Sequence, residues 1–198
     1  MCFDNVIEDP ALIVVDVQKD FAKPDYAFGE SVEHLDQMIK QTEKFLDRYR
    51  KSGRSPIFIR TVHDENTDSP TWLTKYSSEE FDRPCIKNSE GTEFISELNV
   101  QEDDVVVTKH RYDAFHNTNL EQYLTANNIS EIIVCGIATN ICVESTVRSA
   151  YNRDYNVTTL SDCVGAADKH LHNAALENMD RFFGGTEPST AIELSEMK

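Results

Sequence analysis

The chain has 198 residues, enough for one α/β domain with a complete hydrophobic core. Apolar residues make up 39% of it and charged residues 27%, which is typical of a globular protein and excludes a disordered chain. The formal charge of −16, from 35 acidic and 19 basic side chains, argues against nucleic acid and anionic lipid as partners.

Short apolar runs alternate with helical patterns along the chain. The run ALIVVDV at 11–17 is apolar except for Asp16, as is typical of a strand buried on both faces. Residues 31–51 carry apolar side chains at helical spacing. Thr118 and Glu121 have the spacing of a capping box, which predicts a helix through about Asn127. Further strands are expected at 56–62, 104–109, 131–136, 156–162 and 190–194, and further helices at 140–153 and 169–182.

This alternation predicts an α/β fold with right-handed crossovers. We expect a single domain over residues 1–198, built on a doubly wound, mainly parallel six-stranded sheet with helices on both faces. The segment at about 63–91 fits this pattern poorly, because it is long and polar and contains two prolines. A long loop of this kind is expected to be a lid, a subunit contact or an irregular surface segment.

No apolar run approaches the ~20 residues that a membrane-spanning helix needs. The acidic amino terminus lacks the basic start and long apolar core of a secretion signal. We therefore expect a cytoplasmic protein without a membrane partner.

The five cysteines are an odd number without CxxC spacing, which argues against a disulfide framework, a zinc ribbon or a thioredoxin-type pair. Cys135 lies inside a predicted strand and is expected in the core. Cys2 lies near the amino terminus and Cys85 in the long loop. Cys163 is the strongest rival to Cys142 as a reactive thiol, but no obvious base or cation precedes it.

Three reactive side chains fall at the carboxyl ends of predicted strands, the edge at which open parallel sheets bind ligands. Asp16 ends the first strand, Lys109 ends the third, and Cys142 follows the fourth at the start of a helix. The positive end of that helix would favour the nucleophilic thiolate of Cys142. Asp16 could act as a general base and Lys109 could stabilise negative charge. A core thiol, a structural ion pair and a strand-end lysine are the ordinary alternatives, but the three together favour catalysis.

Three blocks of the sequence resemble the isochorismatase-like cysteine hydrolases: DVQKDF (16–21), KHRYDAF (109–115) and GIATNICVEST (136–146). The resemblance covers nearly the whole chain and implies a catalytic triad of Asp16, Lys109 and Cys142. It also implies a cis peptide bond between Ile137 and Ala138. The N–H groups of Ala138 and Cys142 would then form the oxyanion hole.

The segments GIATNICVESTVRSA and FHNTNL are most similar to the ureidoacrylate amidohydrolase and biuret hydrolase branch. That resemblance implies cleavage of a C–N bond in a small amide or ureido compound through a thioester intermediate. Gln18, Phe21, Trp72 and Asn117 are the candidates for the substrate-binding wall. A nicotinamidase, another family hydrolase, a catalytically silent binding protein and a thiol peroxidase-like protein stay as alternatives. The expected partners are a small-molecule substrate and further copies of the chain, in a homo-oligomer such as a dimer or tetramer.

We expect no metal and no other cofactor. The metal site of nicotinamidases is written Asp-x-His, and the corresponding stretch here is Thr61-Val62-His63, without the Asp and without a second His before His110. His63 is therefore expected to be a pocket or structural residue. No phosphate-binding GxGxxG or GxxxxGK[ST] sequence occurs.

Overall fold

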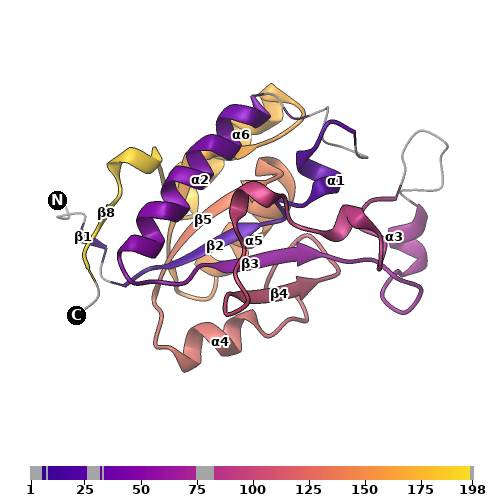
Figure 1. Cartoon of the computed structure of the whole chain (residues 1–198), viewed down its shortest axis with the longest axis horizontal. Helices are drawn as coiled ribbons and strands as arrows, with labels where there is room; N and C mark the ends of the chain where they lie inside the picture. Colours follow the sequence, from indigo (N-terminus) through magenta and orange to yellow (C-terminus); the bar gives the residue numbers. More distant parts are fainter. Residues whose placement is uncertain (1–5, 8, 26–31, 33, 75–82, 197–198) are drawn as a thin grey trace.

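Residues 6–7, 9–25, 32, 34–74 and 83–196 are described by the structure, a computed structural model (Figure 1). Its main sheet has six strands in the order β4-β3-β2-β5-β6-β7, and every neighbouring pair is parallel. This arrangement confirms the predicted single α/β domain with a six-stranded, mainly parallel sheet. The strands are β2 (Ala11–Val15), β3 (Ile57–Thr61), β4 (Val105–Lys109), β5 (Glu131–Ile137), β6 (Asn156–Gly165) and β7 (Gly185–Glu187).

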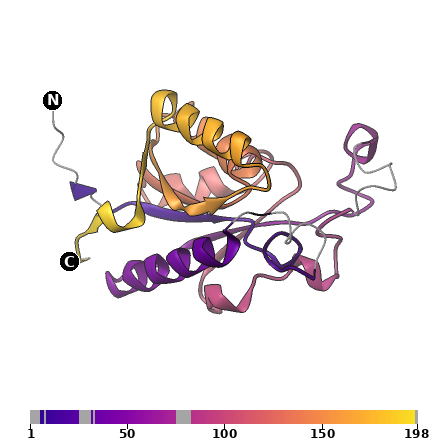
Figure 2. The same cartoon turned by 90° about the horizontal axis from the view of Figure 1, so that it is seen from above.

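Helices cover both faces of the sheet, as Figure 2 shows from above. The helices are α1 (Lys19–Ala22), α2 (Leu35–Lys51), α3 (Pro70–Thr74), α4 (Leu120–Ala126), α5 (Glu144–Tyr151) and α6 (Lys169–Phe182). Shorter turns are the 3₁₀-helices at Glu90–Thr92, Ser96–Leu98 and Ser189–Ala191 and a π-helix at Thr139–Val143. No helix in the described part of the chain is long and apolar enough to cross a membrane.

The central strand β2 serves two separate cores. Leu12 and Val14 pack into the core that contains the buried side chains of α2, whereas Ile13 and Val15 pack into the core of α4, α5 and α6. Every residue of β2 is buried, because each face of the strand meets a helical layer. This is the physical reason for the continuous apolar run in the sequence.

The last strand of the sheet differs from the prediction. We expected it at 190–194, but β7 at Gly185–Glu187 pairs with β6 instead. The N–H and hydroxyl of Ser189 donate to the Asp162 carboxylate at 2.7 and 2.8 Å, and this contact accompanies a 3₁₀ turn where the strand was expected. After Ile192 the chain forms β8 (Glu193–Leu194), which pairs with β1 (Val6–Ile7) in a separate two-stranded sheet.

The starts of α2 and α4 differ from the prediction. The described part of α2 begins at Leu35, preceded by His34 in the left-handed region with φ of 56°, and residues 26–31 and 33 lie outside the described residues. The predicted capping box of α4 does not form. The hydroxyl of Thr118 accepts the N–H of Leu120 at 3.2 Å, rather than the N–H of Glu121.

Candidate active site

The three predicted reactive residues lie together at the carboxyl edge of the sheet. Thr61, the last residue of β3, is in register with Lys109, the last residue of β4. Asp16 follows the last residue of β2, and Cys142 lies in the π-helix that follows β5. Because these four strands are neighbours, their ends bring together side chains that are far apart in the sequence.

A buried ion pair forms the centre of this group. Nζ of Lys109 lies 2.6 Å from Oδ2 of Asp16, and both side chains are almost fully buried. The same Nζ donates to the hydroxyl of Thr61 at 2.7 Å, to the carbonyl oxygen of Arg111 at 3.0 Å and to Sγ of Cys142 at 3.4 Å. The ammonium is therefore held between a carboxylate and a sulfur atom, with the close partners that a buried charge requires.

The electrostatics of the site favour a neutral thiol beside a charged lysine. Burial raises the pKa of Cys142 to about 12, while Lys109 pulls this pKa down and Asp16 pushes it up. Burial also opposes the Lys109 ammonium, but Asp16 and Cys142 outweigh it and raise the pKa of Lys109 above its ordinary value. The resting site at neutral pH therefore holds an ammonium and a thiol.

This result corrects the expectation that the helix start favours a resting thiolate. Cys142 lies in a single π-turn, ahead of α5, and its side chain is buried. The loss of water around the sulfur therefore outweighs the attraction of Lys109. Asp16 is the carboxylate of the same group, paired with Lys109.

The close approach of β2 and β5 shapes the turn that leads to Cys142. Gly136 has φ of +123°, and a Cβ at this position would lie 2.0 Å from the carbonyl oxygen of Val15, so only glycine fits. The next peptide bond, between Ile137 and Ala138, is cis, as the resemblance implies. The carbonyl of Ala138 then accepts the N–H of Val143 at 3.2 Å, which closes the π-turn.

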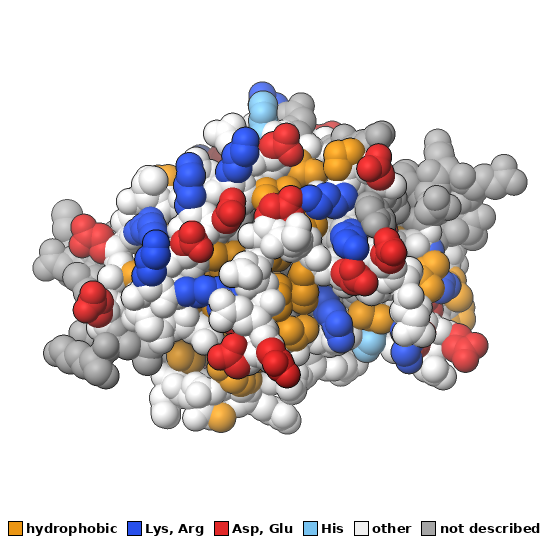
Figure 3. Space-filling model, viewed as in Figure 1, with side chains coloured by type: hydrophobic (Ala, Val, Ile, Leu, Met, Phe, Trp, Pro, Cys, Tyr) orange, Lys and Arg blue, Asp and Glu red, His pale blue; other side chains and the backbone are white. Residues whose placement is uncertain are grey.

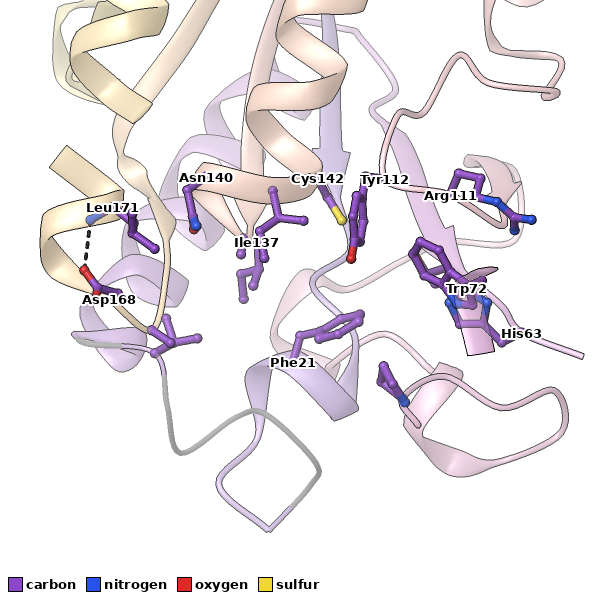
Figure 4. A pocket seen from close by; sticks show the side chains of 16 residues that line it. Phe21, His63, Trp72, Arg111, Tyr112, Ile137, Asn140, Cys142, Asp168 and Leu171 are labelled. Carbon is purple, nitrogen blue, oxygen red and sulfur yellow. Dashed lines mark hydrogen bonds between the residues drawn. The ribbon is translucent and has the colours of Figure 1, made fainter. Parts of the chain in front are cut away.

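A cavity of about 390 Å³ opens beside the sulfur of Cys142 (Figure 4). Its walls come from α1, from the 63–91 segment, from the turn after β5 and from the start of α6. The structure places the candidate binding residues Phe21 and Trp72 on this wall. The Cys142 thiol and a space of ligand size are therefore next to each other.

The other two candidate binding residues lie elsewhere. Gln18 is fully buried. Its side-chain amide forms hydrogen bonds with the backbone of Thr61 and with the carbonyl oxygen of Thr92. Asn117 is exposed at a turn with φ of 54°, and its amide contacts the ring of His116 at 3.1 Å. Neither residue lines the cavity, so both expectations are corrected. An amide turned inward can satisfy three backbone groups at once, which is the role that Gln18 takes.

His63 lies on the cavity wall, with Nδ1 2.9 Å from Oδ1 of Asp68 and its ring 5.1 Å from that of Trp72. Burial lowers the pKa of His63, although Asp68 opposes this effect, so the ring is neutral at pH 7. Among the described residues, no group of three or more His, Cys, Asp or Glu side chains is placed to hold a metal ion.

Comparisons with known proteins show to which family this chain belongs. Residues 10–191 match the isochorismatase domain. A ureidoacrylate amidohydrolase from Methylobacterium radiotolerans is 32% identical over 206 residues, covering 93% of this chain and 80% of that protein. The chain belongs to the isochorismatase family. A probable inactive nicotinamidase from Arabidopsis thaliana is 30% identical to this chain, covering 94% of each of the two chains. This chain is also similar to the crystal structure of a cysteine hydrolase from Pseudomonas syringae pv. phaseolicola 1448A. The TM-score is 0.82 and the identity 28%, and the match covers 91% of this chain and 89% of that one.

The beginning and the later part of the long 63–91 segment of this isochorismatase-family hydrolase are hydrogen-bonded to each other. The N–H of His63 donates to the carbonyl of Cys85 at 2.8 Å, and the N–H of Lys87 donates to the carbonyl of His63 at 2.9 Å. The segment contributes Trp72 and Pro84 to the cavity wall. Residues 75–82 lie outside the described residues, so its role as a lid or a subunit contact stays a prediction.

Sequence reasoning missed several residues of this isochorismatase-family site. Thr61 contacts Lys109, and its place at the end of a predicted strand was a signal that could have identified it. Tyr112 and Leu171 line the cavity from the loop after β4 and from the first turn of α6. Their inward positions depend on the path of loops, which no short sequence pattern predicts.

Proposed function

We propose that the protein hydrolyses a carbon–nitrogen bond of a small amide or ureido compound, with Cys142 as the nucleophile. The observation that supports this most strongly is the buried pair of Asp16 and Lys109 at 2.6 Å, with the same Nζ 3.4 Å from the sulfur beside a cavity. An ion pair with a purely structural role would not need a thiol within hydrogen-bond distance of its ammonium group. The amidohydrolase relative supports a carbon–nitrogen bond as the target.

In the first half of the proposed reaction, Asp16 takes the proton of Cys142 while the sulfur attacks the carbonyl carbon. The Lys109 ammonium stabilises the negative charge on the sulfur during this transfer, because it lies 3.4 Å away. The new C–S bond leaves a tetrahedral oxyanion. The N–H groups of Ala138 and Cys142 are proposed to donate to that oxygen.

In the second half, the C–N bond breaks and Asp16 returns the proton to the leaving nitrogen, which departs as ammonia or an amine. A thioester with Cys142 is left. Water then attacks the thioester carbonyl while Asp16 takes one proton from this water. The C–S bond breaks, and Asp16 gives this proton to the departing sulfur, which regenerates the thiol and the carboxylate. Asp16 therefore acts as base, acid, base and acid in turn.

The test is a panel of small amides, ureido acids and nicotinamide, assayed for ammonia release. We expect turnover of at least one compound, loss of turnover in Cys142→Ala, and near-normal turnover in Cys163→Ala. Acid quenching followed by mass spectrometry should find the acyl adduct on the peptide that contains Cys142. Full activity of Cys142→Ala would reject the proposed nucleophile. Selective release from nicotinamide would identify the nicotinamidase alternative, and no release from any compound would favour a silent binding protein.

A further inference from the structure

The cavity beside Cys142 is lined mainly by apolar and aromatic side chains. Figure 4 labels Tyr112, Ile137 and Phe21 on the side of the cavity near Cys142, and Leu171 farther along its wall beside Asp168. A volume of about 390 Å³ falls in the range of small-molecule sites, which fix a ligand by apolar contact and a few polar groups. This wall offers a ligand much apolar surface.

Among the described residues that line the cavity, the only side chains with a full charge are Arg111 and Asp168. Nη1 of Arg111 donates to the carbonyl of Thr67 at 3.0 Å, and the guanidinium lies over the ring of Trp72 at 5.3 Å. Figure 4 shows this guanidinium turned away from Cys142. The protein therefore engages Nη1 of the arginine, and the guanidinium points away from Cys142.

The charged groups of Asp168 and Lys109 also have partners within the protein. The Asp168 carboxylate accepts the N–H of Leu171 at 2.9 Å and so caps α6. The Lys109 ammonium is held by Asp16, Thr61 and the backbone behind the sulfur. A substrate carboxylate seated beside Cys142 would lose its water, and among the described residues that line the cavity no cation points toward it. The net charge of −16 also disfavours the approach of anions.

We propose that the substrate is an uncharged amide or urea whose substituent is branched aliphatic or aromatic, rather than an acid with a free carboxylate. This inference rests on the proposed function for the position of the reacting carbonyl beside Cys142. The apolar substituent packs against Phe21, Tyr112 and Leu171, and its burial supplies the binding energy.

Binding can be measured without turnover. The Cys142→Ala variant keeps the cavity walls, and Trp72 is the single tryptophan of the chain, so its fluorescence reports occupancy of the cavity. Two matched pairs of ligands differ only by an isopropyl group in place of a carboxylate. They are 4-methylpentanamide with succinamate, and 3-methylbutylurea with 3-ureidopropanoate. We expect the uncharged member of each pair to bind at least about tenfold more tightly.

A second variant reverses the preference. Leu171 is 48% exposed at the cavity wall, so Leu171→Arg adds a cation there without burying it. In the Cys142→Ala background this variant should shift the ratio of affinities toward the carboxylate member by at least about tenfold. Phe182→Arg is the matched control, because Phe182 is 60% exposed on the same helix and lies outside the cavity wall. It should leave the ratio unchanged.

Tighter binding of the carboxylate members, equal binding within the pairs, or no binding of either member overturns the inference. Equal shifts in Leu171→Arg and Phe182→Arg also overturn it. These outcomes are distinct from failure of the proposed function. Selective binding of the uncharged members without ammonia release from them by the wild type would reject the hydrolysis but retain the ligand class.

Discussion

The side-chain amide of Gln18 holds the backbone of Thr61 from both sides, accepting its N–H at 2.7 Å and donating to its carbonyl oxygen at 2.9 Å. The hydroxyl of Thr61 in turn accepts from Lys109. Gln18 is therefore a positioning residue for the lysine, although it does not line the cavity.

We expect Gln18→Ala to lower kcat with little change in KM, because the ammonium loses its fixed position while the cavity wall is unchanged. The variant should also lose about 2 kcal/mol or more of unfolding free energy, since buried backbone groups lose their partner. Steady-state kinetics and urea unfolding measure the two effects. Gln122→Ala, on the exposed surface of α4, should change neither. A raised KM with unchanged kcat would instead indicate direct substrate contact by Gln18.

Removing one member of the buried ion pair should be costly. Asp16→Asn and Lys109→Met should each lower the unfolding free energy by about 3–5 kcal/mol, because each leaves its partner's charge buried alone. Asn suits position 16, where φ is +51°. The double variant should lose less than the sum of the two, which a double-mutant cycle in urea measures.

The surface pair of Lys19 and Glu93 is the matched control for this cycle, since both side chains are partly exposed. Its coupling energy should be below about 1 kcal/mol. Additive losses in the double variant of Asp16 and Lys109 would show that the buried pair does not act as a unit.

Stability should fall at alkaline pH because of the buried thiols. Burial is the main effect that raises the pKa of Cys163 to about 12, with Asp162 adding to it, and a thiol in the unfolded chain titrates near ~8.5. The folded state holds this proton more tightly. Its stabilisation is therefore complete below about pH 8.5 and is lost as the pH rises toward 12.

We expect Cys163→Ala to make the decline of unfolding free energy with pH shallower by about 1.4 kcal/mol per pH unit in this window. Urea unfolding between pH 8 and pH 11 measures this slope. Val157→Ala removes apolar volume from the same strand without removing a thiol, so its slope should equal that of the wild type. Identical slopes for Cys163→Ala and Val157→Ala would contradict the prediction.

Gly136→Ala should destabilise the protein by at least about 3 kcal/mol or prevent folding. The new Cβ would lie 2.0 Å from the carbonyl oxygen of Val15, at a backbone φ of +123° that other residues rarely adopt. Gly185→Ala is the control, because no atom lies within 4 Å of the added Cβ. Thermal unfolding of the two variants compares them, and a Gly136→Ala protein as stable as Gly185→Ala would contradict the close approach of β2 and β5.

Much of the fold was predictable because its central strands are buried on both faces. β2 is entirely apolar and β5 carries no charged side chain after Glu131, and the order of these strands with the helices indicates parallel pairing. The strand β7 was not predictable, because its three residues, Gly185–Glu187, include no large apolar side chain. The position of β7 in the sheet depends on its pairing with β6, and no local sequence pattern predicts that pairing.

The meeting of Asp16, Lys109 and Cys142 was predictable from strand ends, but the state of the sulfur was not. The sequence places Cys142 after a strand and before a helix, a position that favours a thiolate if water reaches it. The structure buries the sulfur and raises its pKa to about 12. Burial depends on the whole surrounding fold, so local spacing could not predict it. Gln18 was misassigned for the same reason, since its side chain turns toward backbone groups remote in sequence.

The strand order has a consequence for how this chain can be divided. The ammonium comes from β4 at one margin of the sheet, and the thiol follows β5, with β3 and β2 between them. A truncated chain that ended after Cys142 would contain all three reactive side chains but would leave β5 without β6, its partner on the other side. The proposed catalytic arrangement therefore depends on the assembly of the whole sheet. If the chain were cut within α4, the two fragments would regain this arrangement only by forming the parallel pairing of β2 with β5 between them.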